Sequence, residues 1–85
     1  MSVVRIGILF FAKTRELAGI SRGTFTVNSV VIGSDLLNQL SQFFGLNSVR
    51  DSLMLALNER YINLNEELSL CEGDEIAIIP PISGG

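Results

Sequence analysis

Histidine is absent from this 85-residue chain, and cysteine occurs once, at Cys71. Without histidine, the usual serine and cysteine catalytic triads cannot form, and a zinc site lacks its common ligands. A single cysteine excludes an internal disulfide, so the fold must rest on its hydrophobic core. The composition therefore predicts one small domain suited to a reducing compartment, which makes the cytosol the expected location.

Positive charge is also scarce, because six basic residues stand against nine acidic ones and Lys13 is the only lysine. A chain with so few cations cannot neutralise many phosphates, so we do not expect it to bind nucleic acid. An acidic domain is instead steered toward a basic surface. Its mean hydropathy of +0.42 is high for so small a domain, which predicts an exposed apolar patch and a protein partner.

Long hydrophobic runs are missing as well. The longest, residues 8–12, is far too short to span a bilayer, and residues 1–6 lack the pattern of a secretory signal. There is also no glycine-rich phosphate loop. We therefore expect a cytoplasmic protein that contacts no membrane and holds no cofactor stably.

Alternating apolar residues predict a first strand over residues 3–11. Its two faces carry Val4, Ile6, Ile8 and Phe10 on one side and Arg5, Gly7, Leu9 and Phe11 on the other. Residues 13–18 are expected to form a short helix that ends at Gly19, and residues 23–27 a second strand.

The main helix is predicted to start at Ser34, a good N-cap, and to stop at Gly45. Its apolar positions have helical spacing and are Leu36, Leu37, Leu40, Phe43 and Phe44. The remaining pattern predicts strands at residues 53–57, 60–62 and 75–79, with turns at Asn58-Glu59 and Gly73-Asp74. These elements indicate an α+β fold, in which one main helix packs across one face of a mixed sheet and leaves the other face open.

The final six residues, Pro80-Pro81-Ile82-Ser83-Gly84-Gly85, are predicted to form a flexible tail after a domain of residues 1–79. Two residues without side chains allow the Gly85 carboxylate to enter a narrow channel. Ordering five or six free residues in a partner costs about 5 to 10 kcal/mol, and two prolines remove part of that cost. The alternative is a frayed end, in which the prolines simply terminate a strand.

The Gly85 carboxylate is the best candidate for a reacting group. Coupling to AMP would give it a good leaving group, after which a sulfur or nitrogen nucleophile could attack its carbonyl carbon. The acidic turn of Glu72, Asp74 and Glu75 could hold a cation, but short acidic turns are usually solvated, and we expect no metal. Cys71 fits a small filler better than a nucleophile.

Three segments of the chain resemble the ubiquitin-like sulfur carrier family that includes the small subunits of molybdopterin synthase. They are residues 10–19 (FFAKTRELAG), residues 56–58 (ALN) and residues 72–85 (EGDEIAIIPPISGG). The last block, with its double proline, is the specific part, whereas other ubiquitin-like proteins share the diglycine. The resemblance implies a β-grasp fold.

The resemblance also implies a reaction sequence and its partners. An activating enzyme that consumes ATP would adenylate Gly85 and convert its carboxylate to a thiocarboxylate. The tail would then enter the large subunit of molybdopterin synthase, in a heterotetramer, and give its sulfur to a cyclic pyranopterin to build the dithiolene. The chain itself would be non-catalytic.

Phe11, Tyr61 and Ile79 match the positions where the family presents apolar contacts to its partners. Strand alternation independently places Phe11 and Ile79 opposite the predicted core. Tyr61 also fits a surface aromatic residue that has no partner.

Other functions remain open at this point. A carrier for thiazole synthesis or tRNA thiolation would share the diglycine, although those relatives resemble this chain less around Pro80-Pro81. A ubiquitin-like modifier would join Gly85 to a lysine of a target protein. A plain β-grasp interaction domain would keep its function after loss of Gly85.

Overall fold

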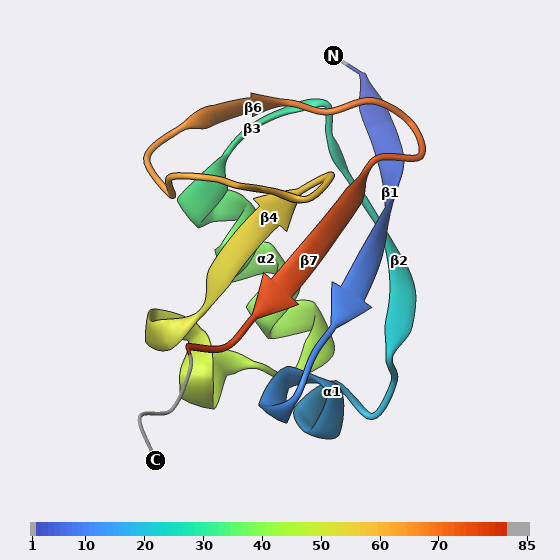
Figure 1. Ribbon diagram of the computed structural model, residues 1–85. Helices are drawn as coiled ribbons and strands as arrows, with labels where there is room; N and C mark the ends of the chain where they lie inside the picture. Colours follow the sequence, from blue (N-terminus) through green and yellow to red (C-terminus); the bar gives the residue numbers. More distant parts are fainter. Residues whose placement is uncertain (1, 82–85) are drawn as a thin grey trace.

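A mixed sheet crossed on one face by a single long helix makes up most of the molecule (Figure 1). The structure, a computed structural model, describes residues 2–81. In chain order, the elements are β1 (Val3–Phe10), α1 (Lys13–Ala18), β2 (Arg22–Asn28), β3 (Val30–Ile32), α2 (Gly33–Phe44), the 3₁₀ helix η1 (Asn47–Ser52), β4 (Met54–Leu57), β5 (Arg60–Tyr61), β6 (Glu67–Ser69) and β7 (Glu75–Ile79). This two-layer α+β arrangement confirms the predicted fold class.

The main sheet has the strand order β2-β1-β7-β4-β5. Its first and last strands in the chain, β1 and β7, lie side by side and parallel, whereas β2 and β4 flank them in antiparallel pairs. This is the β-grasp topology that the resemblance implies. Because parallel strands end at the same edge of a sheet, Phe11 and Ile79 emerge together at one end of the molecule.

The hydrophobic core lies between the sheet and α2. The predicted inward face of β1 supplies Ile6, Ile8 and Phe10, each at most 2% exposed. The core is completed by residues from α2, β4, β7 and the connecting segments, among them Leu36, Leu37, Leu40, Leu46, Leu55, Ile76 and Ile78. Burying each such side chain contributes roughly 1.5–3 kcal/mol, so this face carries most of the stability.

The start of α2 differs from the prediction. Ser34 is not its N-cap, because the helix begins at Gly33 and has no side-chain cap. The N–H groups of Gly33 and Ser34 donate instead to the carbonyl oxygens of Glu66 (2.9 Å) and Leu64 (2.8 Å). A Cβ atom on Gly33 would lie 3.1 Å from the Leu64 Cα, so the close approach of this loop favours glycine. The predicted stop at Gly45, with φ of 75°, is correct.

Three short elements were not predicted. β3 and β6 form a separate two-stranded antiparallel sheet, and η1 follows α2. Strands of three residues are too short to show an alternating pattern. The predicted strand 60–62 is only two residues long, as β5. Within residues 2–81, neither helix combines the length and the hydropathy that a bilayer crossing needs.

Candidate functional site

An apolar groove with a volume of about 230 Å³ lies on the sheet face opposite α2. We call it the open-face groove. It is lined by Leu9, Phe11, Ala56, Glu59, Tyr61, Glu75, Ala77 and Ile79, which come from β1, β7, β4, β5 and the ends of these strands. Residues far apart in the chain therefore form a single surface.

The hollow arises from small side chains in the middle of a row. Strand register places Leu9 beside Ala77, Ala77 beside Ala56, and Ala56 beside Tyr61. The two central positions end at Cβ, whereas Leu9 and Tyr61 at the ends of the row are large. A shallow apolar depression bounded by larger side chains suits an apolar side chain of a partner.

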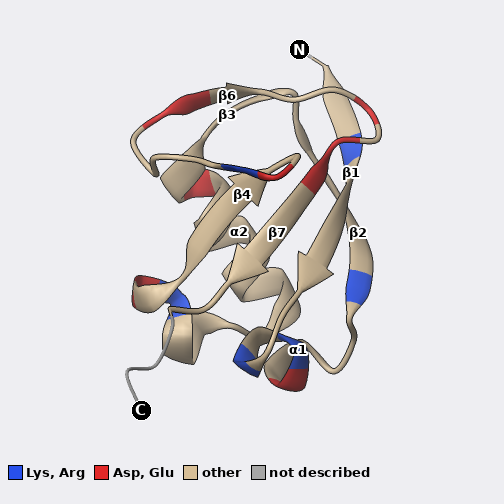
Figure 2. Ribbon diagram, in the orientation of Figure 1, with Lys and Arg blue, Asp and Glu red and all other residues tan. Residues whose placement is uncertain are grey.

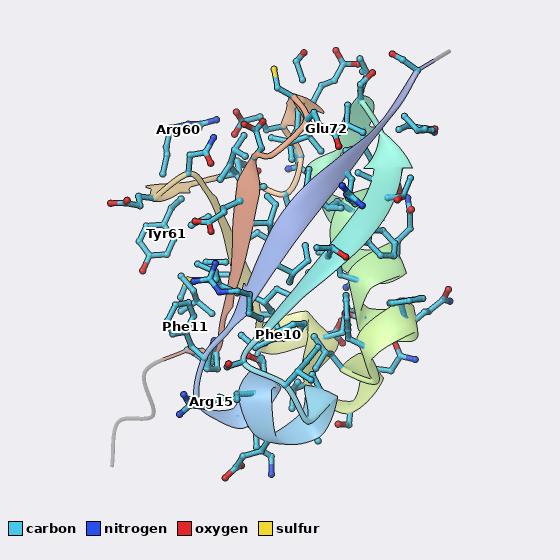
Figure 3. The ribbon with its side chains drawn as sticks, turned by 90° about the vertical axis from the view of Figure 1, so that its right-hand side faces the viewer. Phe10, Phe11, Arg15, Arg60, Tyr61 and Glu72 are labelled. Carbon is cyan, nitrogen blue, oxygen red and sulfur yellow. The ribbon has the colours of Figure 1, made fainter. Side chains whose placement is uncertain are left out.

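The structure brings together the three residues predicted to contact a partner. Phe11 and Tyr61 are 45% and 62% exposed, and Ile79 is half-buried. Figure 3 shows Phe11 and Tyr61 on the same side of the molecule. Met54, which is paired with Ile79 and 40% exposed, extends the patch. Exposed apolar residues grouped in this way are typical of a binding surface. The role of these three residues as partner contacts stays a prediction.

The Thr14 side chain lies at the ends of β1 and β7, and sequence reasoning missed it. Its buried hydroxyl accepts a hydrogen bond from the Phe11 N–H (3.0 Å) and donates to the Phe11 carbonyl (2.7 Å). The same oxygen lies 3.3 Å from the Ile78 carbonyl oxygen. A threonine a few residues after the end of a strand is a typical source of such local bonds, which is the signal that could have revealed it.

Backbone strain is concentrated beside the groove. Among the described residues, the non-glycine residues with positive φ are Ala12 (51°), Asn58 (48°) and Glu59 (72°). Ala12 directly follows Phe11, and the other two form the turn between β4 and β5, where Asn-Gly is the favoured pair. Such conformations cost about 1–3 kcal/mol each and are concentrated at functional sites.

Asn58 is well suited to its turn, because its side chain bonds to the start of β7. Its Oδ1 accepts from the Glu75 N–H (2.9 Å), and its Nδ2 donates to Asp74 Oδ1 (3.1 Å). Glu59 has no equivalent bond among the described residues and still occupies the position where glycine is normal.

Charge is distributed unevenly over the molecule. Many acidic residues lie around β6 and the start of β7, whereas basic residues are spread over α1, β1, β2 and the segment around β5 (Figure 2). In the acidic region, the Arg60 guanidinium and the Asn63 N–H donate to the Glu66 carboxylate, at 3.0 and 3.2 Å, and these bonds lower the pKa of Glu66 below its ordinary value of 4.5. Glu75, at the groove, pairs with Arg22 at 3.2 Å.

The acidic turn before β7 uses its carboxylates to hold the backbone. Glu72 accepts from the Arg5 N–H and Asp74 from the Cys71 N–H, both at 2.8 Å. Residues 2–81 contain no group of three or more side chains able to hold a metal. Cys71 is exposed, so its interpretation as a small filler of the core is wrong.

The described chain continues past β7 with half-buried Pro80 and exposed Pro81. The other predicted tail residues, Ile82, Ser83, Gly84 and Gly85, lie outside the described residues. The division into a domain of residues 1–79 and a tail of residues 80–85 stays a prediction, as does the role of the Gly85 carboxylate.

Comparisons with known proteins identify relatives of the whole chain. Residues 8–85 match the model of the ThiS family. The molybdopterin synthase sulfur carrier subunits of Drosophila melanogaster and Drosophila erecta are 52% and 54% identical over 84 residues, which cover 98% of this chain and 93% of each relative.

Solved structures are similar as well. A protein-protein complex of subunits 1 and 2 of molybdopterin-converting factor from Helicobacter pylori contains a chain that is 28% identical, with a TM-score of 0.68 and coverage of 96% of this chain and 100% of that one. The small archaeal modifier protein 1 from Methanosarcina acetivorans is 24% identical over the full length of both chains, with a TM-score of 0.77. At this identity, the second likeness shows the fold alone.

Proposed function

Because this chain belongs to the ThiS family and, within it, to the molybdopterin synthase sulfur carrier subunits, we propose that it carries sulfur on its C-terminal carboxylate and delivers it during molybdopterin synthesis. The observation that carries the proposal is the 52% identity over 98% of the chain to a sulfur carrier subunit. The chain acts as the non-catalytic subunit of molybdopterin synthase.

The proposed chemistry begins at Gly85. Its carboxylate attacks the α-phosphorus of ATP in the activating enzyme, and pyrophosphate leaves. A sulfur nucleophile at the oxidation level of sulfide then attacks the carbonyl carbon of the acyl-adenylate. The bond to AMP breaks, AMP leaves, and loss of the proton on sulfur gives the thiocarboxylate. The thiocarboxylate then gives its sulfur to a cyclic pyranopterin in the large subunit. Two such transfers supply both sulfurs of the molybdopterin dithiolene. No cofactor stays bound to the carrier, because ATP is consumed by the activating enzyme.

The body of the protein presents the tail to its partner. The open-face groove docks on the large subunit through Phe11, Tyr61 and Ile79. Ile79 lines the groove and is also the last residue of β7. The proposed tail therefore begins at the edge of the groove. The Thr14 hydroxyl exchanges two hydrogen bonds with Phe11 at that edge, so docking through Phe11 and Ile79 sets the point from which the tail starts.

The large subunit is the best supported partner, because the similar chain from Helicobacter pylori belongs to a structure of subunits 1 and 2 in complex. We further propose a heterotetramer of two small and two large subunits, an activating enzyme as a second partner, and a cytosolic location. Conjugation to target proteins is not favoured, because the likeness to an archaeal modifier rests on the fold alone.

Mass spectrometry of the carrier tests the proposal. The protein is incubated with its activating enzyme, ATP and a sulfur source, and both the intact protein and its fragments are measured. We expect one oxygen to be exchanged for sulfur at Gly85. Fragmentation is needed because oxidation of Met1 or Met54 adds nearly the same mass.

A chain without Gly85 provides the matched control. It should keep its circular dichroism spectrum and thermal transition, because the residue lies outside the described core, while molybdopterin formation with the large subunit is abolished. Undiminished molybdopterin formation by the truncated chain, or an unmodified Gly85 beside a competent activating enzyme, would overturn the proposal.

A further inference from the structure

The cations of this protein are almost fully paired with carboxylates. Among the described residues, which include all six cations, five ion pairs are present: Arg5–Glu72 (3.9 Å), Lys13–Glu16 (3.8 Å), Arg22–Glu75 (3.2 Å), Arg50–Asp51 (3.0 Å) and Arg60–Glu66 (3.0 Å). Within residues 2–81, Arg15 is the cation left without a carboxylate partner. A positive charge without an internal partner is available to another molecule.

Arg15 lies at the end of the sheet where β1 and β7 terminate. It is exposed on α1, one turn after Phe11, and Figure 3 shows it beyond Phe11 along the side that also carries Tyr61. The α1 helix reaches this position through Ala12, whose φ of 51° and ψ of −124° are unusual for a residue with a side chain. The unfavourable conformation of Ala12 therefore costs free energy at the residue that leads into the helix carrying Arg15.

Glu59 lies at the opposite end of the open-face groove. It precedes β5 in the turn that bonds to Glu75, the first residue of β7. The other groove carboxylate, Glu75, is paired with Arg22, whereas the Glu59 carboxylate has no ion pair or hydrogen bond among the described residues. The backbone of Glu59 has a φ of 72°, a conformation that glycine adopts without strain.

We infer that Glu59 and Arg15 fix the direction in which a segment of the large subunit lies along the open-face groove, with a basic side chain of that segment beside Glu59 and an acidic one beside Arg15. This inference rests on the proposed function, since it names the chemistry of the segment that docks. The partner segment is apolar in the middle, over Ala56 and Ala77, and carries opposite charges at its two ends.

Repulsion between like charges sets the direction of the partner segment more than attraction between opposite charges does. An exposed ion pair contributes little by itself, but like charges brought together at an interface are strongly unfavourable. A segment lying in the reverse direction would place its cation against Arg15 and its carboxylate against Glu59. The two charges therefore exclude one of the two orientations that an apolar groove alone would accept.

A charge exchange distinguishes this arrangement from general electrostatic steering. The double variant Glu59→Arg with Arg15→Glu keeps the net charge but reverses the polarity of the groove. We expect its dissociation constant for the purified large subunit, measured by calorimetry at low salt, to rise at least about tenfold, and the difference to shrink as salt is added.

The matched control exchanges an ion pair on the same helix. The variant Lys13→Glu with Glu16→Lys reverses an exposed pair away from the groove lining, and its dissociation constant should stay within about twofold of the unmodified protein. Thermal unfolding checks that both variants fold.

Two single substitutions test the same inference if the charge-exchange variant fails to fold. Glu59→Gln should weaken binding about two- to fivefold, whereas Glu67→Gln, which removes an exposed and unpaired carboxylate on β6, should not. Equal affinities for these two variants, or for the two charge exchanges, overturn the inference.

Phe11→Glu, measured in the same titrations, separates the two proposals. If it weakens binding roughly a hundredfold while reversal of the charges has no effect, the docking face stands and only the inferred direction is wrong. If it binds like the unmodified protein, the proposed docking face itself is wrong.

Discussion

The two faces of the main sheet both carry apolar residues, yet they are packed differently, and β7 contributes to each. Ile76 and Ile78 point to the α2 side and are fully buried, whereas Ala77 and Ile79 line the open-face groove. The covered face is filled with large branched side chains. The open face instead combines small residues at its centre with large ones around them, so it leaves a space that another molecule can fill.

Backbone strain distinguishes the faces further. The described non-glycine residues with positive φ adjoin the groove, beside Phe11 and in the turn that leads to Tyr61. The strands that bury the core side chains contain none of them. Favourable packing is thus concentrated on the covered face, and unfavourable geometry is tolerated where a partner is proposed to bind.

The largest expected difference between the faces is in stability. Ile78→Ala should lower the free energy of unfolding by about 2–5 kcal/mol, because it leaves a cavity under α2. Ile79→Ala, one position along the same strand, should cost less than about 1 kcal/mol. Urea unfolding of both variants measures the difference, and equal losses would show that the open face contributes to the core.

The next effect is in binding. Phe11→Glu or Ile79→Glu should weaken binding of the large subunit by about 3 kcal/mol, roughly a hundredfold, because a charge is buried without a partner. Phe43→Glu is the control, since Phe43 is 68% exposed on α2 and does not line the groove. A titration in which all three variants bind alike would place the docking surface elsewhere.

Sequence reasoning predicted the covered face well, because burial on one side imposes a strict alternation that is visible in β1 and β7. The same alternation placed Phe11 and Ile79 on the other face. Tyr61 was assigned through family resemblance, and the row that unites it with Ala77 and Ala56 depends on strand register. Register is a property of paired strands, so no single segment contains it.

Features formed by distant backbone groups were not predictable. The loop carbonyls of Leu64 and Glu66 bond to the start of α2, so Ser34 is not needed as a cap. The strain at Ala12 and Glu59 was equally hidden, since neither residue type suggests a positive φ. The sequence therefore predicts which residues are apolar at the site, but not the backbone geometry that positions them.

A smaller effect tests the strain. Ala12→Gly should raise the free energy of unfolding by about 1 kcal/mol, because relief of the positive φ exceeds the entropy cost of glycine. Ala77→Gly should have the opposite sign and lose about 0.5–1 kcal/mol, since glycine weakens an ordinary strand position. Two losses in urea unfolding would mean that Ala12 is not strained.

The smallest expected effect is a pH dependence at Glu66. Its pKa in the folded state lies below the ordinary value of 4.5, so the unfolded state binds more protons and stability increases with pH through this region. The contribution is fully present above about pH 4.5 and is lost as the pH falls through the lower folded pKa. The melting temperature of Glu66→Gln should therefore fall below that of the unmodified protein at neutral pH and approach it in acid. A difference independent of pH would contradict the assignment.

The end of β7 at Ile79 also sets a length scale for the partner. Six residues, from Pro80 to Gly85, follow this strand, and fully extended they span at most about 20 Å. If Ile79 docks on the partner as proposed, the length of the proposed tail, residues 80–85, limits how far Gly85 can reach beyond the docking surface. Any enzyme that docks on this groove and acts on Gly85 must hold its reacting atoms within that depth below its own contact surface, so the reach of the tail selects partners by the geometry of their active sites.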